Sequence, residues 1–199
     1  LVDASGENMV VVAAGANATL TAAAVAEGLR RIGPGPADVV LVSGEVPEAC
    51  AEAAIRGGAG ARTVYNLAPF RGLPGWLQDV RPLLVLNQTE AAQATGSTDA
   101  EPAAAALSRR FGAVVVTRGS RGALLVHDGV PHDVPAQPVE PVDTTGAGDA
   151  FCGAIAAEFA AGRPLERAIT VAVRAATFAV TGRGARGALA TRADLGPTG

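Results

Sequence analysis

Short apolar runs rich in β-branched residues alternate with longer alanine-rich stretches along the first half of the chain. Near-continuous apolar runs are typical of parallel strands that are buried on both faces. Such runs lie at Met9–Ala13, Val39–Val42, Thr63–Tyr65, Leu83–Leu86 and Ala113–Val116. The stretches between them predict helices near residues 21–31, 47–57, 88–95 and 101–111. This alternation of strands and helices predicts an α/β layered fold with a mainly parallel sheet.

The pattern changes in the second half of the chain. Two short apolar segments, Ala123–His127 and Val130–Val134, are separated by Asp128-Gly129. Because Asp-Gly suits the positive φ angles of a type I′ turn, this region predicts a β-hairpin. Two long helices and one short helical turn are then expected, near residues 147–161, 165–181 and 191–195.

Composition narrows the possible partners. The 199 residues suffice for one domain with a sizeable core, and we expect a single domain over residues 1–199. A formal charge of −3 offers no basic field for nucleic acid or an anionic membrane. There is also no apolar run long enough to predict a membrane span. Cys50 and Cys152 follow no metal-ligand spacing and are compatible with reduced thiols, so we expect a cytoplasmic protein.

All sixteen basic residues are arginine. The absence of lysine excludes a P-loop lysine, a Schiff-base lysine and a Ser-x-x-Lys nucleophile. A His-rich metal site is disfavoured because the chain has only two histidines. A Rossmann dehydrogenase is disfavoured as well, since no Gly-x-Gly-x-x-Gly follows the first predicted strand.

The most informative candidate for a catalytic segment is Asp143-Thr144-Thr145-Gly146-Ala147-Gly148-Asp149-Ala150-Phe151, which leads into a predicted helix. Its two glycines let backbone N–H groups converge, and the first helical turn adds unpaired donors and a partial positive charge. Such a place suits a phosphoryl group in transfer, and Asp149 can take the proton from an attacking hydroxyl. The alternative is a glycine turn with an acid that stabilises a helix start.

This segment resembles the C-terminal signature of the ribokinase-like, or PfkB, family of carbohydrate kinases. Shorter matches occur in the family's order at Ala4–Asn8, Gly15–Ala18, Asn66–Pro69, Asn87–Glu90 and Thr117–Gly122. The first two resemble the strand and loop that precede a helix in ribokinases. The resemblance implies a three-layer αβα fold with a mainly parallel sheet. It also implies ATP-dependent phosphorylation of a sugar hydroxyl, with conversion of ribose to ribose 5-phosphate as the favoured reaction.

The resemblance also implies roles for the glycine-rich segment. Asp149 is similar to the family's catalytic base, which also contacts the sugar. Gly146, Ala147 and Gly148 are similar to its anion hole, whose amides stabilise charge on the transferring phosphoryl group. Gly148 and Asp149 are therefore expected to lie beside the nucleotide as well.

Other matches place the nucleotide and the sugar. Asn87 and Glu90 resemble the pair that handles the ATP phosphates and the Mg²⁺ shell, although Glu90 could instead be a solvated acid at a helix start. Glu45 resembles the sugar-binding acid, with a surface loop acid as the alternative. The matched loop, with an ordinary strand-to-hairpin turn as the alternative, comprises Thr117, Arg118, Gly119, Ser120, Arg121 and Gly122.

A monovalent cation is the third cofactor that the resemblance implies, after ATP and Mg²⁺. The matching positions are Asp143 and Thr145, with backbone carbonyls from Ala179, Gly182 and Gly184. Ala188 stands where ribokinases carry a hydroxyl ligand, so dependence on K⁺ stays open.

The family's first strand, sugar-binding glycine loop and small β lid have no counterpart in this sequence. A chain without them is expected to bind nucleotide weakly and to turn over poorly. The alternatives to a ribose kinase are therefore a truncated, non-catalytic nucleotide- or sugar-binding module and a PfkB kinase for another sugar or a nucleoside. Homodimerisation is an open question at this point.

Overall fold

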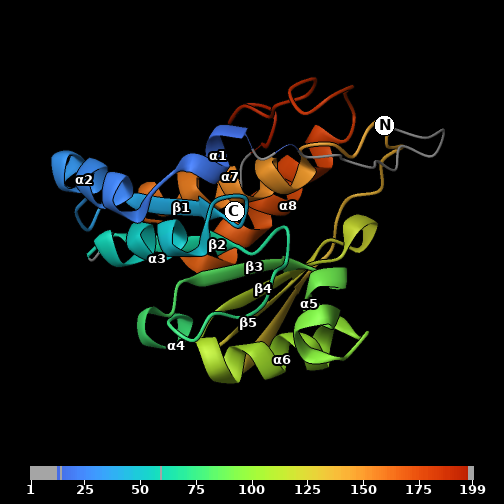
Figure 1. Cartoon of the computed structure of the whole chain (residues 1–199). Coiled ribbons are helices and arrows are strands. Elements are labelled where there is room, and N and C mark those ends of the chain that lie inside the picture. Colours follow the sequence, from blue (N-terminus) through green and yellow to red (C-terminus); the bar gives the residue numbers. More distant parts are fainter. Residues whose placement is uncertain (1–12, 14, 59, 197–199) are drawn as a thin grey trace. The chain divides into compact units, whose positions relative to one another are not determined.

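The computed structural model describes residues 13, 15–58 and 60–196 (Figure 1). The chain divides into two compact units. The sheet unit consists of the described residues within Ala14–Arg118 and Leu124–Asp133. The helix-pair unit includes Gly119–Ala123 and the described residues from Val134 onward. The single domain expected over residues 1–199 stays a prediction.

A six-stranded sheet in the order β1-β2-β3-β4-β5-β6 forms the core of the sheet unit. Its strands are β1 Val39–Ser43, β2 Arg62–Asn66, β3 Leu83–Asn87, β4 Val114–Thr117, β5 Ala123–His127 and β6 Val130–Val134. The first four are parallel neighbours, which confirms the predicted mainly parallel sheet. Asp128 and Gly129 join β5 to β6 with φ angles of 51° and 76°, as a type I′ hairpin turn requires.

Six helices belong to the sheet unit: α1 Gly15–Thr19, α2 Ala22–Ile32, α3 Glu48–Gly57, α4 Leu77–Val80, α5 Gln88–Thr95 and α6 Ala100–Phe111. All but α1 and α4 were predicted. The segment Gly15–Ala18, which the resemblance places in a loop, lies in α1. The expected strand Met9–Ala13, apart from Ala13, and the Ala4–Asn8 motif lie outside the described residues.

One face of the sheet packs against α5 and α6 (Figure 1). Leu86 and Val116 on the strands form a continuous core with Leu107 of α6. Val85 and Val115, which alternate with them along the strands, are also buried. Both faces of these strands therefore carry buried side chains, as the near-continuous apolar runs predict.

The helix-pair unit is built on α7, Ala147–Ala160, and α8, Leu165–Ala179, which pack side by side (Figure 1). Between them Gly162 adopts a left-handed φ of 71° that ends the first helix region. The helical turn expected near 191–195 is a hydrogen-bonded turn, in which the amides of Asp194 and Leu195 donate to the Thr191 carbonyl. No helix among residues 13, 15–58 and 60–196 is both long and apolar enough to cross a membrane.

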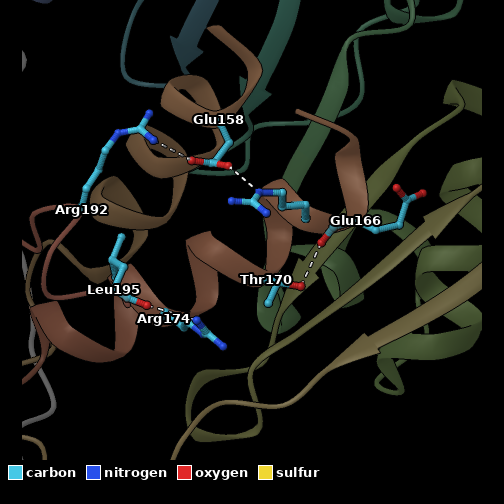
Figure 2. Close-up of polar contacts among 7 residues, drawn as sticks. Glu158, Glu166, Thr170, Arg174, Arg192 and Leu195 are labelled. Carbon is cyan, nitrogen blue, oxygen red and sulfur yellow. Dashed lines mark hydrogen bonds and ion pairs between the residues drawn. The ribbon is translucent and has the colours of Figure 1, made fainter. Parts of the chain in front are cut away.

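A buried acid ties the C-terminal turn to these helices (Figure 2). Glu158 on α7 is only 6% exposed, and its Oε2 lies 3.3 Å from Nε of Arg167 on α8. Its Oε1 lies 4.0 Å from Nη1 of Arg192 in the tail. Arg174 of α8 also donates to the carbonyl of Leu195 at 3.1 Å. The tail is thus fixed to both helices by charged side chains.

We predict that Glu158→Gln lowers the free energy of unfolding by about 1–3 kcal/mol, because it removes the charge that the two arginines face in a largely buried position. Glu52→Gln is the matched control, since Glu52 pairs with Arg56 on the surface of α3 with side chains 36% and 44% exposed. Exposed pairs contribute less than about 1 kcal/mol. Urea denaturation measures both variants, and equal losses would contradict the structural role of Glu158.

Candidate active site

The loop before α7 is held by the carboxylate of Asp143, a side chain only 6% exposed. Its Oδ1 accepts a hydrogen bond from the Thr145 amide at 2.9 Å, and its Oδ2 accepts one from the Gly184 amide at 2.7 Å. Hydrogen bonds from the Thr145 side chain and amide, and then from the Gly184 amide, lower the pKa of Asp143. The glycine-rich loop is therefore fixed to the segment that follows α8.

The two glycines of this loop have different requirements. Gly146 is the N-cap of α7 with a left-handed φ of 83°. A Cβ atom at Gly146 would lie 2.9 Å from the Cα and the carbonyl oxygen of Ala185, so neither the conformation nor the space suits another residue. Gly148 has no left-handed φ, and a Cβ atom there would meet nothing within 4 Å. Only Gly146 is needed for the local structure, whereas Gly148 borders open space.

Asp149 lies in the first turn of α7 and is exposed. The Ala147 amide donates weakly to the Thr144 carbonyl at 3.3 Å. No described residue accepts a hydrogen bond from the amides of Gly148 and Asp149, and none bonds to the Asp149 carboxylate. Unpaired first-turn donors, the positive end of the helix dipole and an accessible carboxylate thus occur in one turn.

The positions matched to a cation site lie on this loop and on the chain around the end of α8. Asp143 brings Thr145 and Gly184 together through its two hydrogen bonds. The Ala179 carbonyl accepts from the Gly182 amide at 3.4 Å, and the Gly184 carbonyl accepts from the Gly187 amide at 3.0 Å. Carboxylate and carbonyl oxygens are ligands that hard cations take. In the described part of the chain, no cluster of three or more His, Cys, Asp or Glu could hold a metal ion.

In the sheet unit, the matched residues follow the carboxyl ends of parallel strands, which share one edge of the sheet. Glu45 follows β1 and is exposed, with its amide donating to Ser43 Oγ at 3.3 Å. Asn87 ends β3 and is the register partner of Thr117, which ends β4. This is the edge where open α/β sheets bind ligands.

Asn87 and Glu90 form a capping box at the start of α5. The Glu90 amide donates to Asn87 Oδ1, and the Asn87 amide donates to Glu90 Oε2, both at 2.8 Å. Glu90 does lie at a helix start, as the alternative to a nucleotide-binding role requires. It is only 8% exposed, however, so it is not a solvated acid. Burial raises the pKa of Glu90, and the bond from the Asn87 amide partly opposes this shift.

The loop after β4 is shaped by contacts that the sequence did not reveal. Gly119–Arg121 forms a short 3₁₀ helix. Gly122 has a φ of 83°, and a Cβ atom there would overlap the carbonyl oxygen of Val134. Arg118 forms an ion pair with Asp133, a residue that sequence reasoning did not select. Arg118 and Gly146 each contact a residue that is distant in sequence, Asp133 and Ala185 respectively. Neither of these two partners belongs to a motif.

The contrast between the glycines gives a test. Gly146→Ala should lower the free energy of unfolding by about 2 kcal/mol or more, because it combines a left-handed conformation with a clash against Ala185. Gly148→Ala should leave stability within about 1 kcal/mol of the parent, since helix propensity favours alanine. Urea titrations of both variants measure the difference. A loss in Gly148→Ala as large as that in Gly146→Ala would contradict this description of the turn.

The lowered pKa of Asp143 predicts a pH dependence of stability. Above the ordinary value of 3.8 the ionised carboxylate stabilises the fold, and this contribution is lost as the pH falls through the lower folded-state pKa. Asp143→Asn should therefore lower Tm at neutral pH, because an amide cannot accept at both positions. The difference from the parent should shrink below pH 3.8. Thermal melts from pH 7 to pH 3 measure it, with Asp99→Asn as control, and a constant difference would contradict the prediction.

Comparison with known proteins places these features in a family. The family model described as pfkB family carbohydrate kinase matches residues 1–192. The ribokinase of Bacillus subtilis is 32% identical over 197 residues, which cover 98% of this chain and 66% of the relative. The cytidine kinase of Thermococcus kodakarensis is 43% identical over 95 residues, covering 45% of this chain and 34% of the relative.

The fold is also shared with a solved structure, that of Arabidopsis thaliana ribokinase complexed with ribose and ATP. It is 26% identical to this chain and has a TM-score of 0.80, covering 98% of this chain and 65% of the solved chain. The chain thus spans about two-thirds or less of the length of these proteins. The α/β fold with a mainly parallel sheet is that of ribokinases, and the chain belongs to the pfkB family of carbohydrate kinases.

Proposed function

We propose that this chain is the nucleotide-binding and catalytic part of an ATP-dependent sugar kinase, with ribose as the favoured acceptor. The observation that carries the proposal is the exposed, unbonded Asp149 carboxylate beside the unpaired amides in the first turn of α7. Membership of the pfkB family and the likeness to ribokinases support it.

In the proposed reaction, Asp149 accepts the proton of the sugar hydroxyl as that oxygen forms a bond to the γ-phosphorus of ATP. The bond between that phosphorus and the bridging oxygen breaks, and ADP leaves. The amides of Gly146, Ala147 and Gly148 donate to the phosphoryl oxygens and stabilise their charge. The two hydrogen bonds that Asp143 accepts keep the loop in the geometry that this role requires, because they fix the backbone on the N-terminal side of Gly146.

The strand-end edge of the sheet unit is the proposed binding surface for the other groups. The loop Thr117–Gly122 contacts ATP, and Glu45 binds a hydroxyl of the sugar. Asn87 and Glu90 fit a role in the hydration shell of Mg²⁺, because Glu90 Oε2 accepts the Asn87 amide while Oε1 accepts no hydrogen bond from a described residue and is available to a metal-bound water. When bound, Mg²⁺ supplies neutralisation of phosphate charge.

A monovalent cation fits the oxygen-rich loop around Asp143, where it would be held by that carboxylate and by backbone carbonyls. Both Asp143 oxygens accept one amide hydrogen bond each, which leaves further lone pairs for a cation. Ala188 contributes no side-chain oxygen, so K⁺ activation is proposed as an addition to the core chemistry rather than a requirement.

Two alternatives share this fold. The likeness to a cytidine kinase over 95 residues favours a nucleoside as the acceptor in place of a free sugar. The second alternative is a non-catalytic nucleotide- or sugar-binding module. These alternatives share the fold and differ in which ligand binds and whether ADP is released.

We predict that Asp149→Asn lowers turnover by about a hundredfold or more while leaving ATP binding intact, because the base is lost and the amides remain. Asp99→Asn is the matched control, since Asp99 also begins a helix, is exposed and makes no side-chain capping bond. Thermal shift with Mg²⁺-ATP measures binding, and a coupled assay measures ADP released with ribose, fructose or cytidine.

The outcomes separate the hypotheses. Release of ADP that depends on ribose supports the favoured reaction, and dependence on cytidine supports the nucleoside alternative. A thermal shift without ADP release from any acceptor supports the non-catalytic module. Neither a shift nor release would overturn the proposed function, and an unchanged rate in Asp149→Asn would remove Asp149 from the role of base.

A further inference from the structure

A cleft of about 290 Å³ lies at the carboxyl ends of β1 and β2, within the sheet unit. Gly44 and Val46 line one side, and the loop that follows β2 lines the other with Leu67 and Leu73. Glu45 does not line this cleft, although both of its neighbours do. The cleft is therefore separate from the side chain proposed to bind the sugar, and its volume is near the lower limit for ligand pockets.

The cleft exists because two backbone segments approach each other closely. The Gly44 amide donates to the Asn66 carbonyl at 2.8 Å. A Cβ atom at Gly44 would lie 2.9 Å from the carbonyl oxygen of Ala68. Leu67 donates its amide to the Val85 carbonyl at 2.9 Å, which holds the loop on β3. The backbone at Gly44 and Leu67, which line the cleft, is thus fixed by hydrogen bonds to the sheet.

The hydroxyl group of Tyr65 faces this cleft without a partner among the described residues. Tyr65 is only 5% exposed, yet it lines the cleft and forms no hydrogen bond with any described residue. The Tyr65 ring is buried, but its hydroxyl oxygen is not closed off from solvent. This oxygen is therefore available to form a hydrogen bond with water or with a ligand in the cleft.

Two opposite charges stand beside that hydroxyl. Glu48, in the first turn of α3, and Arg71, in the loop after β2, both line the cleft. Both side chains are exposed, and neither forms an ion pair or a side-chain hydrogen bond with a described residue. Burial raises the pKa of Tyr65; the charge of Glu48 raises it further, and that of Arg71 lowers it, so both charges act on the phenol.

We propose that this cleft binds a small aliphatic amino acid. The Arg71 guanidinium binds its carboxylate, the Glu48 carboxylate binds its ammonium group, and the Tyr65 hydroxyl forms a hydrogen bond to the carboxylate. The side chain of the amino acid packs against Val46, Leu67 and Leu73. A simple anion would be repelled by Glu48 and a simple cation by Arg71, so a molecule with both charges fits best.

Trp76 supplies a direct signal for binding. It is the single tryptophan of the chain, and its ring stacks on Tyr65 with a centroid distance of 5.9 Å. We expect L-leucine to change its fluorescence in a saturable manner at millimolar concentrations or below. L-leucinamide, which lacks the carboxylate, and N-acetyl-L-leucine, which lacks the ammonium group, should each bind at least about tenfold more weakly.

Three variants of the 199-residue chain test the contacts. Arg71→Gln and Glu48→Gln should each weaken L-leucine binding at least about tenfold, and Tyr65→Phe by about threefold to tenfold. Arg109→Gln and Glu101→Gln on α6 are matched controls, since they remove the same charges from exposed positions away from the cleft. Thermal melts verify that each variant is folded.

The proposal is overturned if L-leucine gives no saturable signal up to about 10 mM, a concentration at which even weak specific ligands bind. It is equally overturned if the two analogues bind as well as L-leucine, or if the cleft variants behave like the α6 controls. None of these outcomes depends on kinase activity, so failure here leaves the proposed function unaffected.

Discussion

The Asp143 carboxylate accepts amide hydrogen bonds from its own loop and from Gly184, 41 residues further along the chain. This acceptor holds together two segments of irregular backbone. The Val142 and Asp143 amides add to the connection, because both donate to the Val180 carbonyl at the end of α8, at 2.8 and 3.3 Å. With the loop fixed, Gly146 adopts its left-handed conformation against Ala185, and α7 begins with Gly148 and Asp149 amides that have no acceptor among the described residues. Every proposed catalytic contact in this unit depends on that start of the helix.

The sheet unit relies on a different principle. Its strands are parallel, so their carboxyl ends meet at one edge, and the residues that follow them are gathered there by topology rather than by individual contacts. The Asn87–Glu90 capping box then satisfies amides at the start of α5 that have no acceptor within the helix, using side chains that are also candidates for nucleotide binding. Structural and proposed functional roles therefore coincide in the same two side chains.

Much of this could be predicted from the sequence because the relevant signals are local. Apolar runs placed β1 to β4, Asp128-Gly129 placed the hairpin, and the nine residues from Asp143 to Phe151 placed a glycine turn before a helix. The four-residue helix α4 was missed because so short a segment has no measurable periodicity. The five-residue α1 was missed for the same reason, and its sequence also resembled a loop.

The contacts that join distant residues could not be predicted in this way. Nothing in the neighbourhood of Asp133 indicates that it pairs with Arg118, and nothing near Glu158 indicates that Arg167 and Arg192 approach it. The cleft beside Tyr65 depends on how Gly44 lies against the backbone of Ala68, a relation set by strand register. Such pairings follow from tertiary packing, for which a single sequence carries no direct record.

The register of the strands gives the sheet edge a stepped profile. Ser43 and Asn66 end their strands level with Val85, whereas Asn87 and Thr117 lie two residues further along β3 and β4. At about 3.3 Å per residue, the sheet edge at β1 and β2 is lower than the edge at β3 and β4 by roughly 6–7 Å. That difference in height is similar to the thickness of a small metabolite. The strand ends therefore form two levels of one edge, at which separate molecules could bind without competing for the same space.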